Sequence, residues 1–307
     1  MKILLLGKSG QVGWELQRAL SVLGEVVALD RHGAEGLCGD LSDLQGLAKT
    51  VRRVQPQVIA NAAAYTAVDK AEGEPELART LNAQAPDVLA REAQQLGAWL
   101  VHYSTDYVFD GSGDRPWRET DAPAPLSVYG QTKLEGERQI VSSGCRHLIF
   151  RTSWVYAVRG NNFAKTILRL ACEREQLSVV NDQIGAPTGA DLLADVTAHA
   201  LRHVLPPVGH NNLAQSGIYH LTASGEASWY DYARFVLENA IRAEGVFKLR
   251  PDNMVSVPSS TYSMPARRPH NSRLDTAKLR ATFGLSLPDW RLGVSRMLAE
   301  LFEGPKS

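Results

Sequence analysis

The stretch Lys2-Ile3-Leu4-Leu5-Leu6-Gly7-Lys8-Ser9-Gly10-Gln11-Val12-Gly13 joins a short apolar run to three closely spaced glycines. Residues 14–20, which follow, carry apolar side chains at helical spacing. The pattern predicts a buried parallel strand, a tight glycine turn and a helix. Gly7, Gly10 and Gly13 would let the backbone approach a pyrophosphate, and the helix N-terminus would present free N–H groups to it. A structural glycine turn without a ligand is the alternative at this point.

A second apolar run, from residue 26 to residue 29, ends at Asp30, where a dinucleotide-binding fold places the group that meets the adenosine ribose. A carboxylate there favours a free 2′-hydroxyl and hence NADH. The guanidinium of Arg31, the next residue, would instead hold a 2′-phosphate, so we expect NADPH, with NADH as a second cofactor. Asp40 would either accept a hydrogen bond from the adenine amino group or cap the helix expected over residues 42–54.

Strand-like and helical segments alternate along the first half of the chain. The expected strands include residues 56–61, 98–103 and 147–150, and the first of these ends at three alanines, Ala62 to Ala64. This order predicts an α/β fold, a Rossmann-type doubly wound parallel sheet with a smaller α/β substrate-binding domain. We place the dinucleotide-binding domain at residues 1–153 and a mainly substrate-binding domain at 154–307, with segments near 185–212 returning to the first.

The composition excludes several classes of partner. The 307 residues include 33 basic and 33 acidic side chains, so bulk charge favours neither nucleic acid nor an anionic membrane. No apolar run is long enough to span a bilayer. The three cysteines have neither the number nor the spacing of a disulfide framework or a zinc site. These features predict a protein of the reducing cytoplasm.

The segment from Ser104 to Lys133 contains the elements of a proton-transfer site. Tyr129 and Lys133 are four residues apart, so they share one face of a helix that Ser127 would cap. Thr105 leaves the preceding strand and would hydrogen-bond a carbonyl oxygen. A free tyrosine has a pKa near ~10, and we expect the Lys133 ammonium to lower that value so that Tyr129 acts as the acid. A chance pair on a surface helix is the alternative, and the glycine turn argues against it. The polar segment from Asp110 to Ala124 is expected to cover the pocket.

Several stretches together resemble the extended short-chain dehydrogenases/reductases, and within them the dTDP-4-dehydrorhamnose reductase family. The resemblance covers nearly the whole chain. The glycine turn and the Tyr/Lys pair identify only the superfamily, whereas the Ser-Thr-Asp-Tyr-Val-Phe and Pro-Ala-Arg-Arg-Pro runs are more specific. The matching stretches are 7–13, 61–69, 104–111, 129–133, 151–156, 182–188 and 265–269.

This resemblance implies reduction of the 4-keto group of dTDP-4-dehydro-L-rhamnose by NAD(P)H, for polysaccharide biosynthesis. Lys133 would also hold the nicotinamide ribose. The residues implied around the cofactor are Gly7, Gly10, Gln11, Val12, Gly13, Asp30, Arg31, Asp40, Leu41, Ala63, Ala64, Tyr65, Tyr129 and Lys133. Those implied around the dTDP-sugar are Thr66, Thr105, Asp106, Tyr107 and Trp154. Arg267 and Arg268 would either clamp the diphosphate or lie in solvent as loop charges.

The resemblance also implies a homodimer and a magnesium ion. The candidate ligands are Glu15, Asp191 and Glu300, with Asp191 at a position where the family pattern favours glutamate. Acidic side chains on helices are more often exposed to solvent than bound to a metal.

Other functions of the same fold stay open. A nucleotide-sugar dehydratase needs an Asp-Glu couple after the threonine, but Tyr107 stands in place of the glutamate. An epimerase is not excluded by these residues. A non-catalytic NADP-binding regulatory subunit would have no chemical need for Thr105, Tyr129 and Lys133 together.

Overall fold

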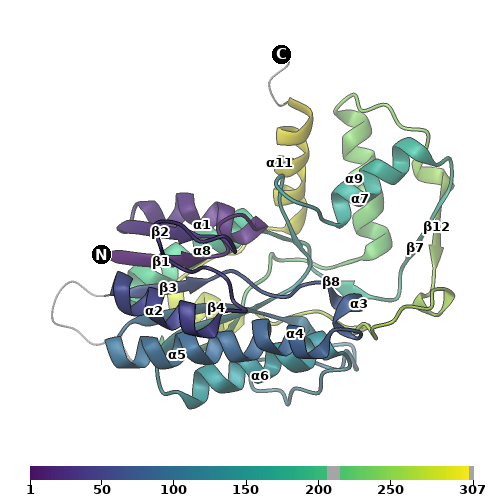
Figure 1. Ribbon diagram of the computed structural model, residues 1–307. Coiled ribbons are helices and arrows are strands. Elements are labelled where there is room, and N and C mark those ends of the chain that lie inside the picture. The colour runs from purple at the N-terminus through teal and green to yellow at the C-terminus, as the bar shows by residue number, and fades with distance from the viewer. Residues whose placement is uncertain (206–214, 304–307) are drawn as a thin grey trace.

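A computed structural model of the chain describes residues 1–205 and 215–303. Its centre is a six-stranded sheet in the order β10-β5-β4-β3-β1-β2, in which every neighbouring pair is parallel (Figure 1). The strands are β1 (Lys2–Leu6), β2 (Glu25–Leu29), β3 (Val58–Asn61), β4 (Trp99–Thr105), β5 (Arg146–Thr152) and β10 (Gly217–His220). Chain order reverses between β1 and β3, so a ligand crevice is expected at their carboxyl ends.

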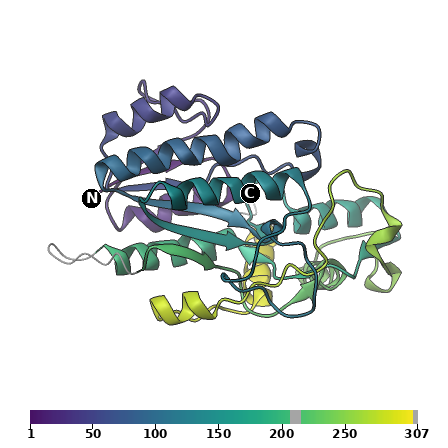
Figure 2. The ribbon, with the colours of Figure 1, turned by 90° about the horizontal axis from the view of Figure 1, so that it is seen from below.

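Helices cover both faces of this sheet because successive strand side chains point to opposite sides. Ile3 and Leu5 belong to one buried cluster with α1 (Gln11–Ser21), α8 (Ala190–Val204) and α10 (Ala277–Phe283). Leu4 and Leu6 belong to another with α2 (Leu44–Val54), α5 (Ala85–Leu96) and α6 (Val128–Ser142). The two helical layers lie on either side of the strands in Figures 1 and 2. The Rossmann-type doubly wound fold is therefore confirmed.

A separate hydrophobic cluster lies beside the sheet. It contains residues of α7 (Phe163–Glu173), α9 (Trp229–Arg242) and α11 (Trp290–Glu303). The parallel pair β7 (Leu177–Val180) and β12 (Met254–Val257) extends from these helices (Figure 1). Two shorter pairs join β6 (Val155–Tyr156) to β9 (Thr188–Gly189), and β8 (Ile184–Gly185) to β11 (Ala227–Ser228). The domain boundary at residue 153 stays a prediction, and the end of the 185–212 segment lies outside the described residues.

The apolar pattern of residues 77–97 is typical of one long helix, but the structure divides this stretch. The short helices α3 (Val68–Ala71) and α4 (Pro75–Arg79) lead into a π-helical turn at Thr80–Gln84, and α5 follows. Single 3₁₀ turns occur at Asp106–Val108, Pro251–Asn253 and Ser259–Thr261. Within residues 1–205 and 215–303, no helix is long and apolar enough to cross a membrane.

Candidate active site

A cleft of about 780 Å³ opens at the carboxyl ends of the central strands. Segments that follow β1, β2, β3, β4 and β5 all contribute to its wall, as expected for a doubly wound sheet. The structure therefore brings together residues that are far apart in the sequence. The predicted site residues that line the cleft are Gly7, Gly10, Gln11, Val12, Arg31, Asp40, Leu41, Ala63, Ala64, Tyr65, Thr66, Thr105, Asp106, Tyr107, Tyr129, Lys133 and Trp154.

The glycine turn has the geometry of a phosphate cradle. Gly7 has a φ of +86°, and a Cβ there would lie 2.8 Å from the Ala63 backbone nitrogen. A Cβ on Gly13 would lie 2.0 Å from the Gly7 carbonyl oxygen, so this glycine permits close packing of α1 rather than lining the cleft. Gly10 precedes α1 and carries no capping side chain, which leaves N–H groups of the first helical turn for a ligand. The residues present therefore fit a dinucleotide pyrophosphate.

Two carboxylates after β2 each lie beside a cation, and Asp40 lines the cleft whereas the predicted site residue Asp30 does not. Asp30 accepts a hydrogen bond from the His32 backbone N–H, and its Oδ2 lies 3.7 Å from Lys8 Nζ. Arg31 Nε lies 3.7 Å from Asp40 Oδ2. The Ser42 backbone N–H, together with the Ser42 hydroxyl and Arg31, lowers the pKa of Asp40. Asp40 is not the helix cap, because Asp43 caps α2 by accepting from Gly46 N–H.

Thr105, Tyr129 and Lys133 reach the cleft from two elements. Thr105 ends β4, and its Oγ1 donates to Asp106 Oδ1 over 3.0 Å while accepting from the Tyr107 backbone N–H over 3.1 Å. Tyr129 and Lys133 lie in α6, which Ser127 caps by accepting from Gly130 N–H. The predicted cap and the shared helical face are therefore present. This arrangement places a phenol, an amine and a hydroxyl at one end of the cofactor cleft.

The expected lowering of the tyrosine pKa is not seen. Burial raises the pKa of Tyr129 to about 12, and the Thr105 hydroxyl acts in the opposite direction. Lys133 Nζ makes its contacts elsewhere, 2.6 Å from the Tyr103 carbonyl oxygen and 3.1 Å from His102 Nε2. Burial also lowers the pKa of Lys133 to about 8. A phenol that keeps its proton at neutral pH is suited to donate it to a carbonyl oxygen.

Asp106 is the buried carboxyl group beside this trio. It is 2% exposed, and within the described residues its Oδ2 has no hydrogen-bond partner. Burial raises the pKa of Asp106 to about 6, although the Ser272 and Thr105 hydroxyls act in the opposite direction. Tyr107, the next residue, packs edge-on against the Tyr129 ring at 5.6 Å. A tyrosine ring therefore stands at the sequence position where the dehydratase pattern has its second carboxylate.

Trp154 lies in a strained conformation at the end of the cleft. Its φ is +50°, a region that non-glycine residues rarely adopt. The indole of Trp229 stacks on it with 3.6 Å between ring centroids, and Trp229 Nε1 donates to Gln183 Oε1 over 3.2 Å. A Cβ on Gly185 would lie 2.7 Å from the Trp154 ring. Sequence reasoning missed Trp229, since nothing local links it to a residue 75 positions earlier.

Asn82, at the π-helical turn, organises the wall of the cleft. Its Oδ1 accepts from the Tyr65 N–H over 2.9 Å, and its Nδ2 donates to the Tyr65 carbonyl and to Thr132 Oγ1. Gly136 in α6 permits the close approach, because a Cβ there would lie 2.1 Å from the Asn82 carbonyl oxygen. Asn82 thus fixes a cofactor-lining residue against the helix that carries Tyr129. In the sequence, Asn82 is a polar residue within an apolar helical pattern, and this is the signal that points to it.

The two predicted arginines have different environments, and neither lines the cleft. Arg268 Nη2 donates to Asp69 Oδ2 over 2.7 Å, and Asp69 also accepts from the Ala266 N–H. Within the described residues, Arg268 Nη1 is buried without a partner. Arg267 is exposed. Only Arg268 is therefore fixed by the structure.

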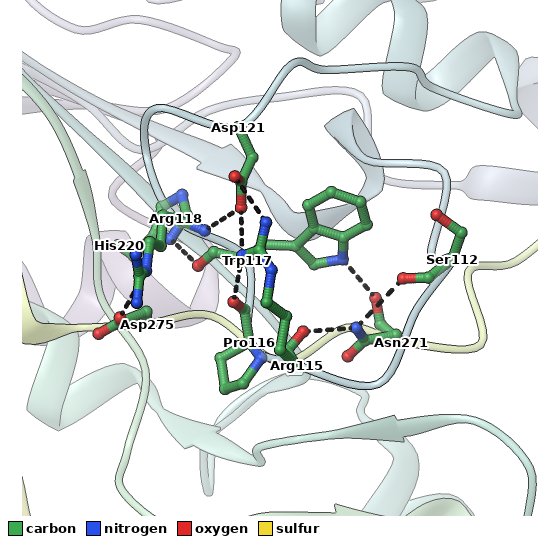
Figure 3. Close-up of polar contacts among 9 residues, drawn as sticks. All are labelled: Ser112, Arg115, Pro116, Trp117, Arg118, Asp121, His220, Asn271 and Asp275. Atoms are coloured by element: carbon green, nitrogen blue, oxygen red, sulfur yellow. Dashed lines mark hydrogen bonds and ion pairs between the residues drawn. The ribbon is translucent and has the colours of Figure 1, made fainter.

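The polar segment from Asp110 to Ala124 forms a brace instead of the expected cover, and none of its side chains lines the cleft. Figure 3 shows Arg115 held by both Asp121 oxygens, at 2.8 and 2.9 Å. Trp117 Nε1 donates to the Asn271 carbonyl over 3.1 Å, and Asn271 Nδ2 donates to the Arg115 carbonyl over 2.8 Å. These contacts join the segment after β4 to residues 271–275. The segment therefore anchors the loop that carries Arg268.

The structure does not support the predicted magnesium site. Asp191 and Glu300 both face Arg296, at 3.9 and 3.5 Å, whereas Glu15 lies 3.6 Å from Arg18. Across residues 1–205 and 215–303 there is no group of three or more His, Cys, Asp and Glu side chains that would hold a metal ion. Arginine cations occupy the positions beside these carboxylates instead.

Known proteins resemble the chain over nearly its full length. The family described as RmlD substrate binding domain matches residues 1–303. The dTDP-4-dehydrorhamnose reductase of Escherichia coli K12 is 59% identical over 302 residues, which cover 98% of each chain. The Clostridium acetobutylicum dTDP-4-dehydrorhamnose reductase structure has a TM-score of 0.86 at 33% identity, covering 98% of this chain and 99% of that one.

A second solved structure carries a cofactor. It is the dTDP-4-dehydrorhamnose reductase of Bacillus anthracis in complex with NADP, with a TM-score of 0.84 at 33% identity, covering 97% of this chain and 99% of that one. Sequence identity and fold agree over nearly the whole chain. The chain therefore belongs to the dTDP-4-dehydrorhamnose reductase family of oxidoreductases.

Proposed function

We propose that the protein reduces the 4-keto group of dTDP-4-dehydro-L-rhamnose to give dTDP-L-rhamnose, with NADPH as the preferred cofactor, for polysaccharide biosynthesis. The observation that carries this proposal is that Thr105, Tyr129 and Lys133 line the same continuous cleft as the glycine turn. The names of the relatives support the substrate, and the NADP complex of the Bacillus anthracis reductase supports the cofactor.

The chain's own residues account for binding and proton transfer. Bound nicotinamide supplies the hydride. When substrate binds, the Thr105 hydroxyl turns from Asp106 to donate to the ketone oxygen and holds it beside the Tyr129 hydroxyl, which donates its proton to that oxygen as the alcohol forms. The Tyr129 phenolate then recovers a proton from solvent. Lys133 offers a positive charge to the phenolate when protonated and a hydrogen bond to the nicotinamide ribose.

The roles that we assign to the surrounding residues rest on their places in the cleft, except that Gly13, Asp30 and Arg268 do not line it and are assigned from the family resemblance. We assign the pyrophosphate to the turn at Gly7–Gly13, and the adenosine end to Asp30, Arg31, Asp40 and Leu41, with Ala63, Ala64 and Tyr65 along the cofactor. Thr66, Asp106, Tyr107 and Trp154 meet the sugar nucleotide, with Arg268 directed to its diphosphate. Residues 1–153 then act mainly on the cofactor and residues 154–307 mainly on the substrate. The homodimer is a further proposal, which sedimentation equilibrium tests.

Two measurements test the reaction. Purified protein with dTDP-4-dehydro-L-rhamnose should oxidise NADPH, and unchanged absorbance at high enzyme concentration would reject the proposed activity. Tyr129→Phe removes only the phenolic proton and should lower the rate by about 10²- to 10⁴-fold. Tyr262→Phe, at an exposed tyrosine, is the matched control and should leave the rate unchanged. Near-normal turnover of Tyr129→Phe would exclude this residue as the acid.

A further inference from the structure

His102 is a buried histidine on β4 to which the proposed reaction assigns no role. Its Nδ1 lies 3.2 Å from Asn61 Nδ2, and its Nε2 lies 3.1 Å from Lys133 Nζ. Each of the three residues is 1% exposed. Because bulk water does not reach them, their donors and acceptors have to be matched within the protein.

The orientation of the Asn61 amide determines which nitrogen of His102 carries the proton. Asn61 Oδ1 accepts from the Ala63 backbone N–H over 3.2 Å, so Nδ2 is the atom that faces the ring. An amide nitrogen only donates. His102 Nδ1 must therefore accept, and a neutral ring carries its proton on Nε2.

The Nε2–H group then points at Lys133 Nζ. An ammonium has three donors and no acceptor, so a charged Lys133 would place two donors face to face. A neutral amine has a lone pair that accepts from Nε2–H, while one of its own N–H groups donates to the Tyr103 carbonyl over 2.6 Å. Every donor and acceptor in the hydrogen-bond series from Asn61 through His102 to Lys133 is matched only when Lys133 is uncharged.

The other groups around Lys133 do not reverse this preference. Glu137 lies one turn further along α6, but its carboxylate is held by Arg151 of β5 at 2.9 and 2.6 Å. Burial lowers the pKa of Lys133 to about 8, with Glu137 acting in the opposite direction. Burial and Lys133 hold the pKa of His102 well below its usual value. Tyr129 on α6, Tyr103 on β4, and Asp106 and Tyr107 after β4 also line the cleft, and burial raises the pKa of each.

We propose that His102, oriented by Asn61, is a positioning residue that holds Lys133 as a neutral amine in the cofactor-free enzyme. Protonation of Lys133 then requires the His102 proton to move to Nδ1, against Asn61, or the ring to lose its contact with Nζ. The pair therefore lowers the pH at which Lys133 loses its charge. The effect of this pair on the pH dependence of the reaction rests on the proposed reduction, whereas the position of the His102 ring proton does not.

The ring proton is directly measurable in the cofactor-free protein. In ¹⁵N-histidine NMR, a protonated and an unprotonated ring nitrogen have well-separated shifts, and each ring is assigned through bonds to its backbone amide. We expect Nε2 of His102 to be protonated and Nδ1 to be unprotonated near pH 7. A proton on Nδ1 would overturn the proposal even if the enzyme reduces its substrate normally. Absence of reductase activity would leave this result unaffected.

Asn61→Asp provides the complementary test. The carboxylate still accepts from Ala63 N–H but also accepts from Nδ1–H, so His102 Nε2 becomes an acceptor for a charged Lys133. The ring shifts should exchange, and the basic limb of the kcat/KM profile should rise by about one pH unit or more. The negative charge of a carboxylate at position 61 would by itself also raise the pH of this basic limb. To separate the two effects, Asn61→Asp is also made in a His102→Gln background. The proposal requires Asn61→Asp to raise the pH of the basic limb more when His102 is present than in the His102→Gln background. An equal rise in both backgrounds, or no rise, would refute it.

Discussion

The indole rings of Trp154 and Trp229 lie 3.6 Å apart with 13° between their planes. Trp154 is held in a left-handed backbone conformation by its surroundings, and Trp229 covers one of its faces. A sugar beside Trp154 would therefore meet the other ring face or the indole N–H. Trp229 supports the substrate end of the cleft through this ring.

Removing the supporting indole should weaken substrate use. We expect Trp229→Ala to lower kcat/KM for the sugar nucleotide by about 3- to 10-fold, because an aromatic pair contributes roughly 0.5–1.5 kcal/mol beyond its buried area. Trp229→Phe retains a stacking surface and should lose less. The near-UV circular dichroism of the coupled indoles should change in both variants. Unaltered kcat/KM in the alanine variant would remove Trp229 from the substrate site.

The buried carboxyl of Asp106 should make stability depend on pH. Its pKa is about 6 in the folded protein and about 4 in an unfolded chain. The folded protein therefore holds a proton that the unfolded chain has lost between these values, so the free energy of unfolding falls as the pH rises through this range and stays lower above it. Asp106→Asn should be more stable than the wild type at pH 8, by up to about 3 kcal/mol, with the difference shrinking toward pH 4. Urea unfolding at both pH values measures this, and a difference independent of pH would contradict it.

Arg31 should decide between the two nicotinamide cofactors. Its guanidinium is exposed at the ribose end of the cleft beside Asp40. Hydrogen bonds to charged groups contribute about 1.5–3 kcal/mol, so Arg31→Ala should raise the KM for NADPH by roughly 10- to 100-fold and change that for NADH little. Arg91→Ala, on the exposed face of α5, is the control. Equal effects on NADPH and NADH would show that Arg31 does not contact the 2′-phosphate.

The two arginines of the Pro-Ala-Arg-Arg-Pro stretch should differ in their effect on the KM for the dTDP-sugar. Arg268 is fixed by Asp69 and keeps a buried N–H without a partner among the described residues, whereas Arg267 is exposed. Arg268→Ala should raise the KM for the dTDP-sugar by about 10-fold or more. Arg267→Ala should change it by less than about 2-fold, as is usual for a solvated charge. The same change in KM for both variants would mean that both arginines, or neither, bind the diphosphate.

Local sequence was sufficient to predict the fold, the glycine turn and the Tyr/Lys pair, whereas most of the other cleft-lining residues came from the family resemblance. Strand, glycine turn and helix alternate with clear periods, and the carboxyl ends of parallel strands must meet at one edge, so the positions of Gly7, Thr105 and Tyr129 followed from chain order alone. The Tyr129 and Lys133 spacing required only helical geometry.

Tertiary structure decided what these groups contact. Lys133 turns to His102 and the Tyr103 carbonyl, and Trp154 meets Trp229, because buried polar atoms and rings find partners on elements that are distant in sequence. The segment from Asp110 to Ala124 likewise forms its hydrogen bonds with a distant element, residues 271–275, and so does not cover the cleft. Periodicity and motif spacing carry no information about such pairings. The amino-acid sequence by itself determined which chemistry is present, and packing determined the protonation and orientation of the groups that perform it.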